Sequence, residues 1–271
     1  MSIDSGAIAR LLAAVEKNTG TDLTGYRRST LARRLARRLL TLGLKEEAYV
    51  QLCTDNTLEC QSFIAEVTVN VSSFFRDPLV FEIVASLLRK LVSKRSDLRI
   101  WSAGCAAGEE TYSLAILVKD ALRLQKVDSG SALVFGTDID PKSIAAAQNA
   151  TYSRESLGEM KLRHFDSWFS LSGQKYTVDP AIRAMVHFSR EDLLNPGTVA
   201  PAESIFGSFD LILCRNVLIY FSQSHQAQIL STLCSSLSEG GYLVLGSSEE
   251  PGPDLRHRLT VIDARNKVYQ K

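Results

Sequence analysis

The sequence predicts a mixed α/β protein in which an all-helical N-terminal region precedes an open, mainly parallel β-sheet. Residues 1–69 carry apolar side chains at helical spacing, in segments that glycines separate. From residue 97 onward, short β-branched strands alternate with helical stretches, which is typical of a parallel sheet covered by helices. Residues 70–96 are expected to form a linker and a connecting helix from Asp77 or Pro78, because proline suits the first helical turn.

The individual elements are predicted from the same patterns. Helical spacing of apolar residues occurs in four segments of the N-terminal region, Ile8–Val15, Leu31–Leu42, Tyr49–Leu52 and Phe63–Val67. Strands are predicted at Leu98–Trp101, Leu133–Gly136, Val186–Ser189, Phe209–Cys214, Gly241–Ser247, Leu259–Asp263 and Lys267–Gln270. Residues 150–186 combine aromatic side chains, a Gly-Gln turn and the alternating segment KYTVDP. This stretch predicts a small inserted β subdomain within the sheet domain of residues 97–271, and the alternative is a plain crossover with a loop.

Composition excludes several classes of protein. With 271 residues, 45% of them hydrophobic and 23% charged, the chain has the composition of a soluble globular protein. A formal net charge of +1 gives no global indication of nucleic-acid binding. The five cysteines form no CxxC pair, which favours a reducing compartment, and no apolar run or secretory signal predicts a membrane span or export. We therefore expect a cytoplasmic protein, and the four scattered histidines predict no metal site.

A glycine turn between two predicted strands is the first candidate for a ligand site. The turn contains Gly104 and Gly108, and the next strand ends at Asp138, where an acid can accept hydrogen bonds from ribose hydroxyls. The dinucleotide fingerprint is absent, and Glu109 and Glu110 would repel a phosphate at the helix N-terminus. A ligand with a ribose, no phosphate and a positive charge fits, and S-adenosylmethionine (SAM) has these properties. The alternative is an ordinary βαβ unit with a tight turn.

Three further polar segments are expected at the same edge of the sheet. Residues 70–76 offer an amide, two hydroxyls, two aromatic rings and a guanidinium, which suits binding of a carboxylate. Residues 190–194 follow a strand and contain an acid where SAM enzymes commonly contact the adenine. Residues 209–221 run from a buried strand into Arg-Asn and then a tyrosine. Each segment alone also fits a helix cap, a loop acid or core packing.

Six motifs together carry a resemblance to a known family. In order they are NVSSFFRD, WSAGCAAGEETYS, FGTDID, DLL, FDLILCRNVLIYF and GGYLVLGSSE. They resemble the chemotaxis-receptor glutamate methyltransferases, the CheR family, over nearly the whole chain. The first and fifth motifs are specific, because a generic class I methyltransferase would lack them. The resemblance implies a class I SAM-dependent methyltransferase sheet, Rossmann-like, with an inserted β subdomain and a preceding all-α domain. Two departures are Ser72, where threonine is frequent, and Thr111, where proline is common.

The resemblance also implies an activity and the residues that support it. The enzyme would transfer the SAM methyl group to glutamates of chemoreceptor cytoplasmic domains, forming methyl esters and S-adenosylhomocysteine. Arg76 and Tyr220 would be catalytic and nearest the methyl group, and Asp138 would be the ribose acid. Which of Glu109 and Glu110 contacts the ligand stays open. The implied cofactor-binding residues are Asn70, Ser72, Arg76, Gly104, Glu109, Glu110, Asp138, Asp192, Leu193, Arg215 and Asn216.

A basic helix in the N-terminal region is the candidate partner site. The segment Tyr26–Lys45 contains seven arginines and lysines and no acid, and Arg33, Arg34, Arg37 and Arg38 share one face. Like charges at this spacing are unfavourable, so an acidic partner would relieve them, whereas a solvated face is the alternative. Nucleic acid or an anionic membrane surface would also be acidic partners. By the resemblance, the partner is the chemoreceptor helical bundle, and we expect a monomer that neither binds nucleic acid nor inserts into membranes.

Three other functions fit the sequence less well. A non-catalytic SAM- or partner-binding regulator would not need Arg76, Asn216 and Tyr220. A methyltransferase for amino groups of nucleic acids or small molecules would show a contiguous proline-rich tetrapeptide, which is missing after residue 215. A nicotinamide-dependent oxidoreductase disagrees with the paired glutamates at the glycine turn. The regulator is the main alternative.

Overall fold

The computed structural model describes residues 3–68, 72–95, 97–126, 131–195, 200–201, 204 and 208–271. The chain forms two compact units. The first consists of residues 1–70 and 219–226, and the second of residues 71–218 and 227–271. The first unit therefore includes a short segment that the sequence analysis assigns to the sheet domain.

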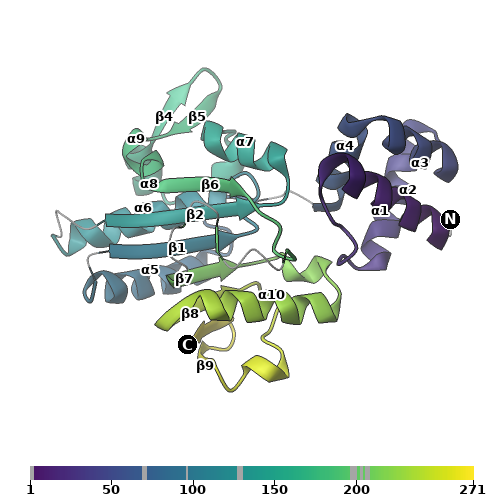
Figure 1. Ribbon diagram of the computed structural model, residues 1–271. Coiled ribbons are helices and arrows are strands. Elements are labelled where there is room, and N and C mark those ends of the chain that lie inside the picture. The colour runs from purple at the N-terminus through teal and green to yellow at the C-terminus, as the bar shows by residue number, and fades with distance from the viewer. Residues whose placement is uncertain are drawn as a thin grey trace. The chain divides into compact units, whose positions relative to one another are not determined.

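The first unit is built from four helices, as predicted (Figure 1). They are α1 (Ser5–Thr19), α2 (Arg28–Leu42), α3 (Glu46–Asp55) and α4 (Thr57–Thr68). The Asp4 carboxylate caps α1 by accepting from the Ala7 N–H, and Gly20 and Gly43 end α1 and α2 in the left-handed conformation. Leu11, Leu35, Tyr49 and Phe63 are almost fully buried between the helices. The predicted all-α N-terminal domain is confirmed.

The segment 219–226 is fixed to the residues that precede α2. Tyr26 and Phe221 form an antiparallel bridge with ring centroids 4.6 Å apart. The Arg27 N–H donates to the Tyr220 carbonyl at 2.8 Å, and the Arg27 Nε–H donates to the Phe221 carbonyl at 2.9 Å. The backbone of Tyr220 is thus held within the first unit.

The second unit contains a seven-stranded sheet in the order β6-β2-β1-β7-β8-β10-β9. The pairs among β6, β2, β1, β7 and β8 are parallel, whereas β10 runs antiparallel to both of its neighbours. The strands are β1 (Asp97–Ala103), β2 (Ser131–Asp138), β6 (Val186–Arg190), β7 (Phe209–Cys214), β8 (Leu237–Leu245), β9 (Thr260–Asp263) and β10 (Val268–Gln270). This arrangement confirms the predicted class I methyltransferase sheet.

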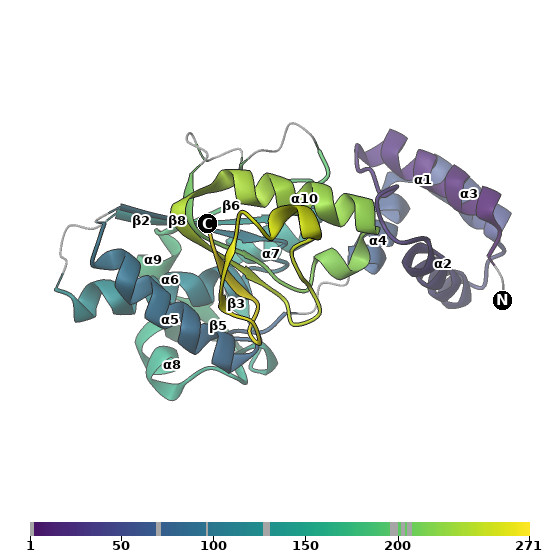
Figure 2. The ribbon, with the colours of Figure 1, turned by 90° about the horizontal axis from the view of Figure 1, so that it is seen from below.

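Helices cover both faces of this sheet. α5 (Pro78–Val92) and α6 (Glu109–Leu124) lie on one face, and α10 (Gln223–Ser236) lies on the other (Figures 1 and 2). The strands are buried from both sides, so β7 is apolar almost throughout and entirely buried. α7 (Pro141–Asn149) follows β2, with the Asp140 carboxylate as its N-cap. The short 3₁₀ turns are η1 (Glu155–Leu157), η2 (Leu218–Tyr220) and η3 (Pro253–Leu255).

The predicted insertion is a small antiparallel subdomain. β3 (Thr151–Tyr152), β5 (Lys175–Val178) and β4 (Phe169–Ser172) form a second sheet in that order. α8 (Leu162–Trp168) precedes β4, and α9 (Pro180–Arg183) leads back to β6. The inserted β subdomain is therefore confirmed, and the alternative of a plain crossover is wrong.

Three further properties concern the described residues only. None of their helices combines the length and apolar character needed to cross a bilayer. They contain no group of three or more histidine, cysteine or acidic side chains that is arranged to hold a metal ion. All five cysteines are free and buried.

Candidate functional site

The carboxyl ends of four strands meet at one edge of the large sheet. Parallel pairing sets Ala103 beside Thr137, and Asp138 beside Arg190. β7 is in register with β1 on its other side, so the end of β7 reaches the same edge. Four predicted site residues follow these strand ends or stand at them: Gly104, Asp138, Asp192 and Arg215. This edge is where open α/β sheets bind their ligands.

The glycine turn after β1 needs glycine at its first position. Gly104 has a φ of +78°, and its N–H donates to the Thr137 carbonyl at 2.8 Å. A Cβ atom at this residue would lie 2.4 Å from Cγ2 of Val217. The turn after β1 thus packs directly on the loop after β7, with no room for a side chain.

Replacing Gly104 with alanine is therefore expected to destabilise the chain more than the same change at Gly173. Gly173 also has a positive φ of +63°, but a Cβ atom there would meet nothing within 4 Å. Both variants carry the cost of left-handed backbone, and Gly104→Ala adds overpacking of about 1–3 kcal/mol. Urea unfolding of the two variants measures the difference. Equal losses of free energy would show that Val217 yields without cost.

Asp138 ends β2 as a buried carboxylate. Its Oδ2 accepts from the Ala106 N–H at 2.9 Å, and its Oδ1 accepts from the Asp140 N–H at 3.0 Å. Burial raises the pKa of this carboxyl to about 6, although the two backbone hydrogen bonds oppose the shift. Each oxygen retains a second lone pair, so the group can accept further hydrogen bonds from a ligand.

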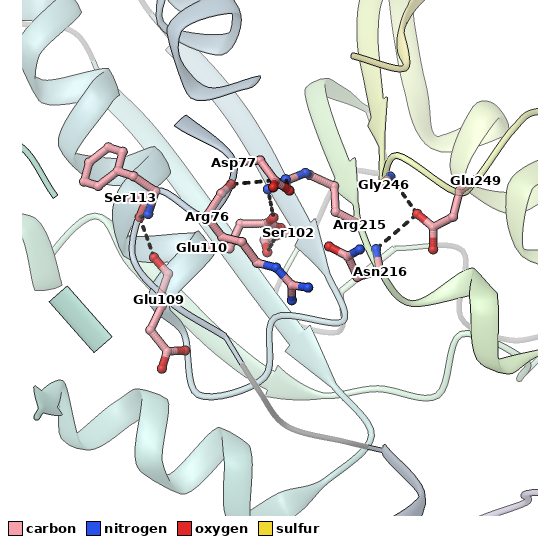
Figure 3. Close-up of polar contacts among 11 residues, drawn as sticks. Arg76, Asp77, Ser102, Glu109, Glu110, Ser113, Arg215, Asn216, Gly246 and Glu249 are labelled. Carbon is pink, nitrogen blue, oxygen red and sulfur yellow. Dashed lines mark hydrogen bonds and ion pairs between the residues drawn. The ribbon is translucent and has the colours of Figure 1, made fainter. Parts of the chain in front are cut away.

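The two glutamates that begin α6 point in different directions (Figure 3). The Glu110 carboxylate accepts from the Ser102 hydroxyl at 2.8 Å and from the Arg215 guanidinium at 3.1 Å. The Glu110 side chain is 13% exposed and lies beside Ser102, near the end of β1. Glu109 is buried, and its Oε2 has no hydrogen-bond partner among the described residues. Burial raises the pKa of Glu109, against hydrogen bonds from its own backbone N–H and the Ser72 hydroxyl.

Arg215 connects three segments at this edge (Figure 3). Its side chain is only 2% exposed and pairs with Asp77 at 2.5 Å and with Glu110 at 3.1 Å. The same guanidinium donates to the backbone carbonyl of Arg76 at 3.1 Å. Its hydrogen bonds therefore hold the Arg76–Asp77 backbone and the start of α6 in place.

The loop before α5 has strained backbone on both sides of Arg76. Phe75 and Asp77 have φ values of +55° and +63°, a region that residues with side chains rarely adopt. The Ser113 hydroxyl accepts from the Phe75 N–H at 3.0 Å, and the Phe75 side chain is buried. Arg76 itself is half-buried. Such strain persists only where the surroundings enforce it, and it is frequent at functional sites.

The sequence patterns did not identify Glu249 as part of this site. Its buried carboxylate accepts from four backbone N–H groups, at distances of 2.6–3.1 Å. The donors are those of Gly246, Asn216, Val217 and Leu218. Three of them belong to the loop after β7, where Asn216 has a φ of +60°. An acid shortly after a buried strand was the available signal, since Glu249 stands four residues past the end of β8.

The remaining predicted site residues differ in how far the structure describes their positions. Asp192 lies two residues past β6, and its Oδ1 accepts from the Leu194 N–H at 2.9 Å, so Leu193 is held within a turn. Asn70 lies outside the described residues. Tyr220 belongs to the first unit and Arg76 to the second, so their proximity stays a prediction.

The interpretation that the α2 arginines have no acidic relief is wrong. Arg38 makes a bidentate contact with Glu59 of α4, at 2.7 and 2.8 Å. Arg34 and Arg37 lie 3.6 and 3.4 Å from Glu66, also of α4. The partners come from a neighbouring helix, which the pattern within α2 does not reveal. Arg33 is exposed, and the described residues place no carboxylate within salt-bridge distance of it.

Comparison with known proteins agrees with this architecture. The family model described as CheR methyltransferase, all-alpha domain, matches residues 6–68. The model described as CheR methyltransferase, SAM binding domain, matches residues 70–268.

Several relatives align over most of the chain. An uncharacterized 104.1 kDa protein of Rhodobacter capsulatus is 31% identical over 97% of this chain, which spans only 27% of that relative. The chemotaxis protein methyltransferase of Listeria innocua is 32% identical over 87% of both chains. That of Salmonella typhimurium is 30% identical over 92% of this chain and 85% of its own. Two domain models in tandem and this level of identity show that the chain belongs to the CheR methyltransferase family, with an all-α domain followed by a SAM-binding domain.

Proposed function

We propose that this protein transfers the methyl group of SAM to glutamate side chains on the cytoplasmic helical bundle of chemoreceptors, in the cytoplasm. The observation that carries the proposal is the strand-end edge that holds Asp138, Glu110 and Arg76 in the SAM-binding domain. The relatives named chemotaxis protein methyltransferase support the chemotaxis context.

The residues at this edge fit SAM. Asp138 has lone pairs left for two ribose hydroxyls, and the acidic start of α6 suits a cationic ligand better than a phosphate. Of the two glutamates, we assign the ligand contact to Glu110. Its carboxylate is partly exposed at the end of β1, whereas Glu109 is buried and points elsewhere. Ser72, Gly104, Asp192, Leu193, Arg215 and Asn216 complete the proposed site, with Asn70 from the linker.

The proposed reaction needs placement more than proton transfer. SAM supplies an electrophilic methyl group on a sulfonium. A glutamate with its reference pKa of about 4.3 is already ionised at pH 7, so no general base is required. Arg76 would orient the incoming carboxylate through partial charge pairing, and Tyr220 would stand beside it. Because opposite charges cancel in the transition state, a dry and well-aligned site favours the reaction.

The decisive experiment is a transfer assay. The full chain is incubated with methyl-labelled SAM and receptor cytoplasmic fragments, and the product is tested for methyl ester that alkali releases. Alkali-labile label on receptor glutamates is expected. Label that resists alkali, or appears only on nucleic acid or small molecules, would contradict the substrate class. SAM binding without any transfer would favour the alternative, a non-catalytic regulator.

Replacing Asp138 with alanine is expected to weaken SAM binding by about 1–3 kcal/mol, through lost charged hydrogen bonds. Wild-type affinity should also fall from pH 7 to pH 5, because the Asp138 pKa of about 6 means that acid protonates the acceptor. Calorimetry at several pH values measures both effects, with Asp138→Asn as the control that should lose the pH dependence. An unchanged affinity in Asp138→Ala would remove this residue from the site.

Docking on the receptor bundle should depend on salt. Arg33 and Arg37 are exposed to acidic helices, although Arg37 also pairs with Glu66, whereas the side chains of Arg34 and Arg38 are mostly buried against α4. Raising salt should weaken binding, and Arg33→Ala should cost about 0.5–1 kcal/mol at low salt. The matched control is Arg28→Ala, another exposed arginine of α2. An affinity for the receptor bundle that is the same at low and high salt would contradict an electrostatic docking surface.

A further inference from the structure

A cavity in the second unit is lined by residues of α5, α6 and α8, and the proposed methyl transfer makes no use of it. Its volume is about 290 Å³, close to the lower limit of roughly 300 Å³ for small-molecule sites. Its lining residues are Ala85, Arg89, Leu117, Asp120, Ala121, Arg123, Leu124, Arg163, His164 and Ser167. A smaller space of about 60 Å³ shares five of these residues and so adjoins it.

The charges around the larger cavity are strongly unbalanced. Three arginines, Arg89, Arg123 and Arg163, face one aspartate, Asp120, which gives these four side chains a net charge of +2. All three arginines are exposed, and none forms a salt bridge with a carboxylate in the part of the chain that the structure describes. Several guanidinium groups around one cavity, none of them in a salt bridge with a described carboxylate, are suited to binding an oxyanion.

Asp120 offsets only one of the three positive charges, and its carboxylate also contacts a buried histidine. Its Oδ2 lies 2.9 Å from Nε2 of His164, a side chain that is 3% exposed. Although burial raises the pKa of Asp120, the contact with His164 and the nearby arginines lower it below its usual value. In the adjoining space, Glu82 pairs with Lys161 and also interacts electrostatically with Arg163 and Arg89, so part of their charge is offset from that side.

Apart from Ser167, the rest of the cavity wall is apolar. Ala85, Leu117 and Ala121 line it from α5 and α6. The Arg123 guanidinium lies 4.1 Å from the centre of the Trp168 ring, which limits its freedom and holds it at the cavity. A ligand with a compact apolar body and an anionic end would satisfy both parts of the wall.

We propose that this cavity binds a small phosphate ester with no more than one ring. A phosphate ester carries nearly two negative charges and three acceptor oxygens, which match a site of charge +2 with three guanidinium groups. A carboxylate offers one charge and two oxygens, and so leaves one arginine unsatisfied. The volume admits an ester with one ring but not a larger ligand. This site is separate from the strand-end edge and does not depend on the methyltransferase activity.

Calorimetric titration of phenyl phosphate into the full chain tests the proposal, with S-adenosylhomocysteine present to occupy the cofactor site. We expect saturable binding that weakens with salt, and at least tenfold lower affinity in Arg123→Ala and Arg163→Ala. Arg154→Ala is the matched control, because Arg154 is an exposed arginine of the same subdomain outside the cavity, and it should bind as the wild type does. Thermal unfolding checks that each variant is folded.

A second variant tests the cavity itself. Ala85→Leu leaves all the charges in place and fills the space that Ala85 lines, so it should also lower the affinity at least tenfold. Binding of phenol as tight as that of phenyl phosphate would overturn the anionic part of the proposal. Absent binding, or equal affinity in the arginine variants and Arg154→Ala, would overturn the site altogether.

Discussion

Replacing Arg215 with methionine is expected to lower the free energy of unfolding by about 3–5 kcal/mol, the usual cost of removing one partner of a buried ion pair. The side chain is 2% exposed and forms ion pairs with Asp77 and Glu110. Without it, the partly buried Glu110 carboxylate loses its counter-charge, and the Arg76 carbonyl loses a donor. Methionine replaces the aliphatic stem of Arg215 but removes the guanidinium, whose carbon lies 5.5 Å from the centre of the Phe81 ring, so the loss reports charge, hydrogen bonds and this cation–π contact together.

Chemical denaturation measures this loss, and two further variants interpret it. Arg215→Lys keeps the charge but lacks the planar, multidentate guanidinium, so an intermediate loss is expected. The double variant Arg215→Met with Glu110→Gln removes the uncompensated charge and should recover part of the stability. If Arg215→Met unfolds at the wild-type denaturant concentration, the ion pairs contribute nothing and this account of the edge is wrong.

Replacing Arg76 with alanine is expected to reduce the rate of ester formation at least a hundredfold, comparable to the loss of one transition-state donor in other enzymes. Arg76 is half-buried between two residues in left-handed backbone, and its carbonyl is fixed by Arg215. The fold thus fixes the backbone from which the guanidinium extends, and misplacement of a reacting group by about 1 Å can cost a hundredfold in rate.

The measurement is single-turnover transfer to receptor fragments with SAM at saturation. Arg76→Lys is the control that keeps the positive charge but not the planar guanidinium group, and it should retain more activity than Arg76→Ala. Calorimetry with SAM separates the two possible contacts of Arg76. A large loss of rate with little loss of affinity supports a role in orienting the glutamate, and an equal loss of both indicates that Arg76 binds the methionine carboxylate. A near-normal rate in Arg76→Ala would refute either role.

The fold could be predicted from the sequence wherever burial alone decides the residue pattern. β7 is buried on both faces, and its predicted and observed bounds are the same, Phe209–Cys214. β8 begins at Leu237, four residues before the predicted start. Its first part is the polar run Ser238–Gly241, whose composition is typical of a loop. α10 ends at Ser236 and β8 begins at the next residue, so no loop marks the boundary between the helix and the strand.

The candidate site could be predicted only in part. Gly104 and Asp138 follow from the rule that ligands bind at strand ends, because each adjoins a recognisable strand. Asp77 and Glu249 could not be assigned, since their roles depend on partners 138 and 31–33 positions away that only the folded chain brings close. The acidic partners of α2 were missed for the same reason, because Glu59 and Glu66 belong to another helix.

The long-range contacts of Arg215 have a consequence for how the chain acquires its ligand affinity. The guanidinium joins segments that are 138 and 105 residues away in sequence, so the strand-end edge is complete only when the whole sheet has formed. Partly folded chains would have no such edge and hence no affinity for the nucleoside. SAM would then bind only the folded chain and add to its stability by mass action.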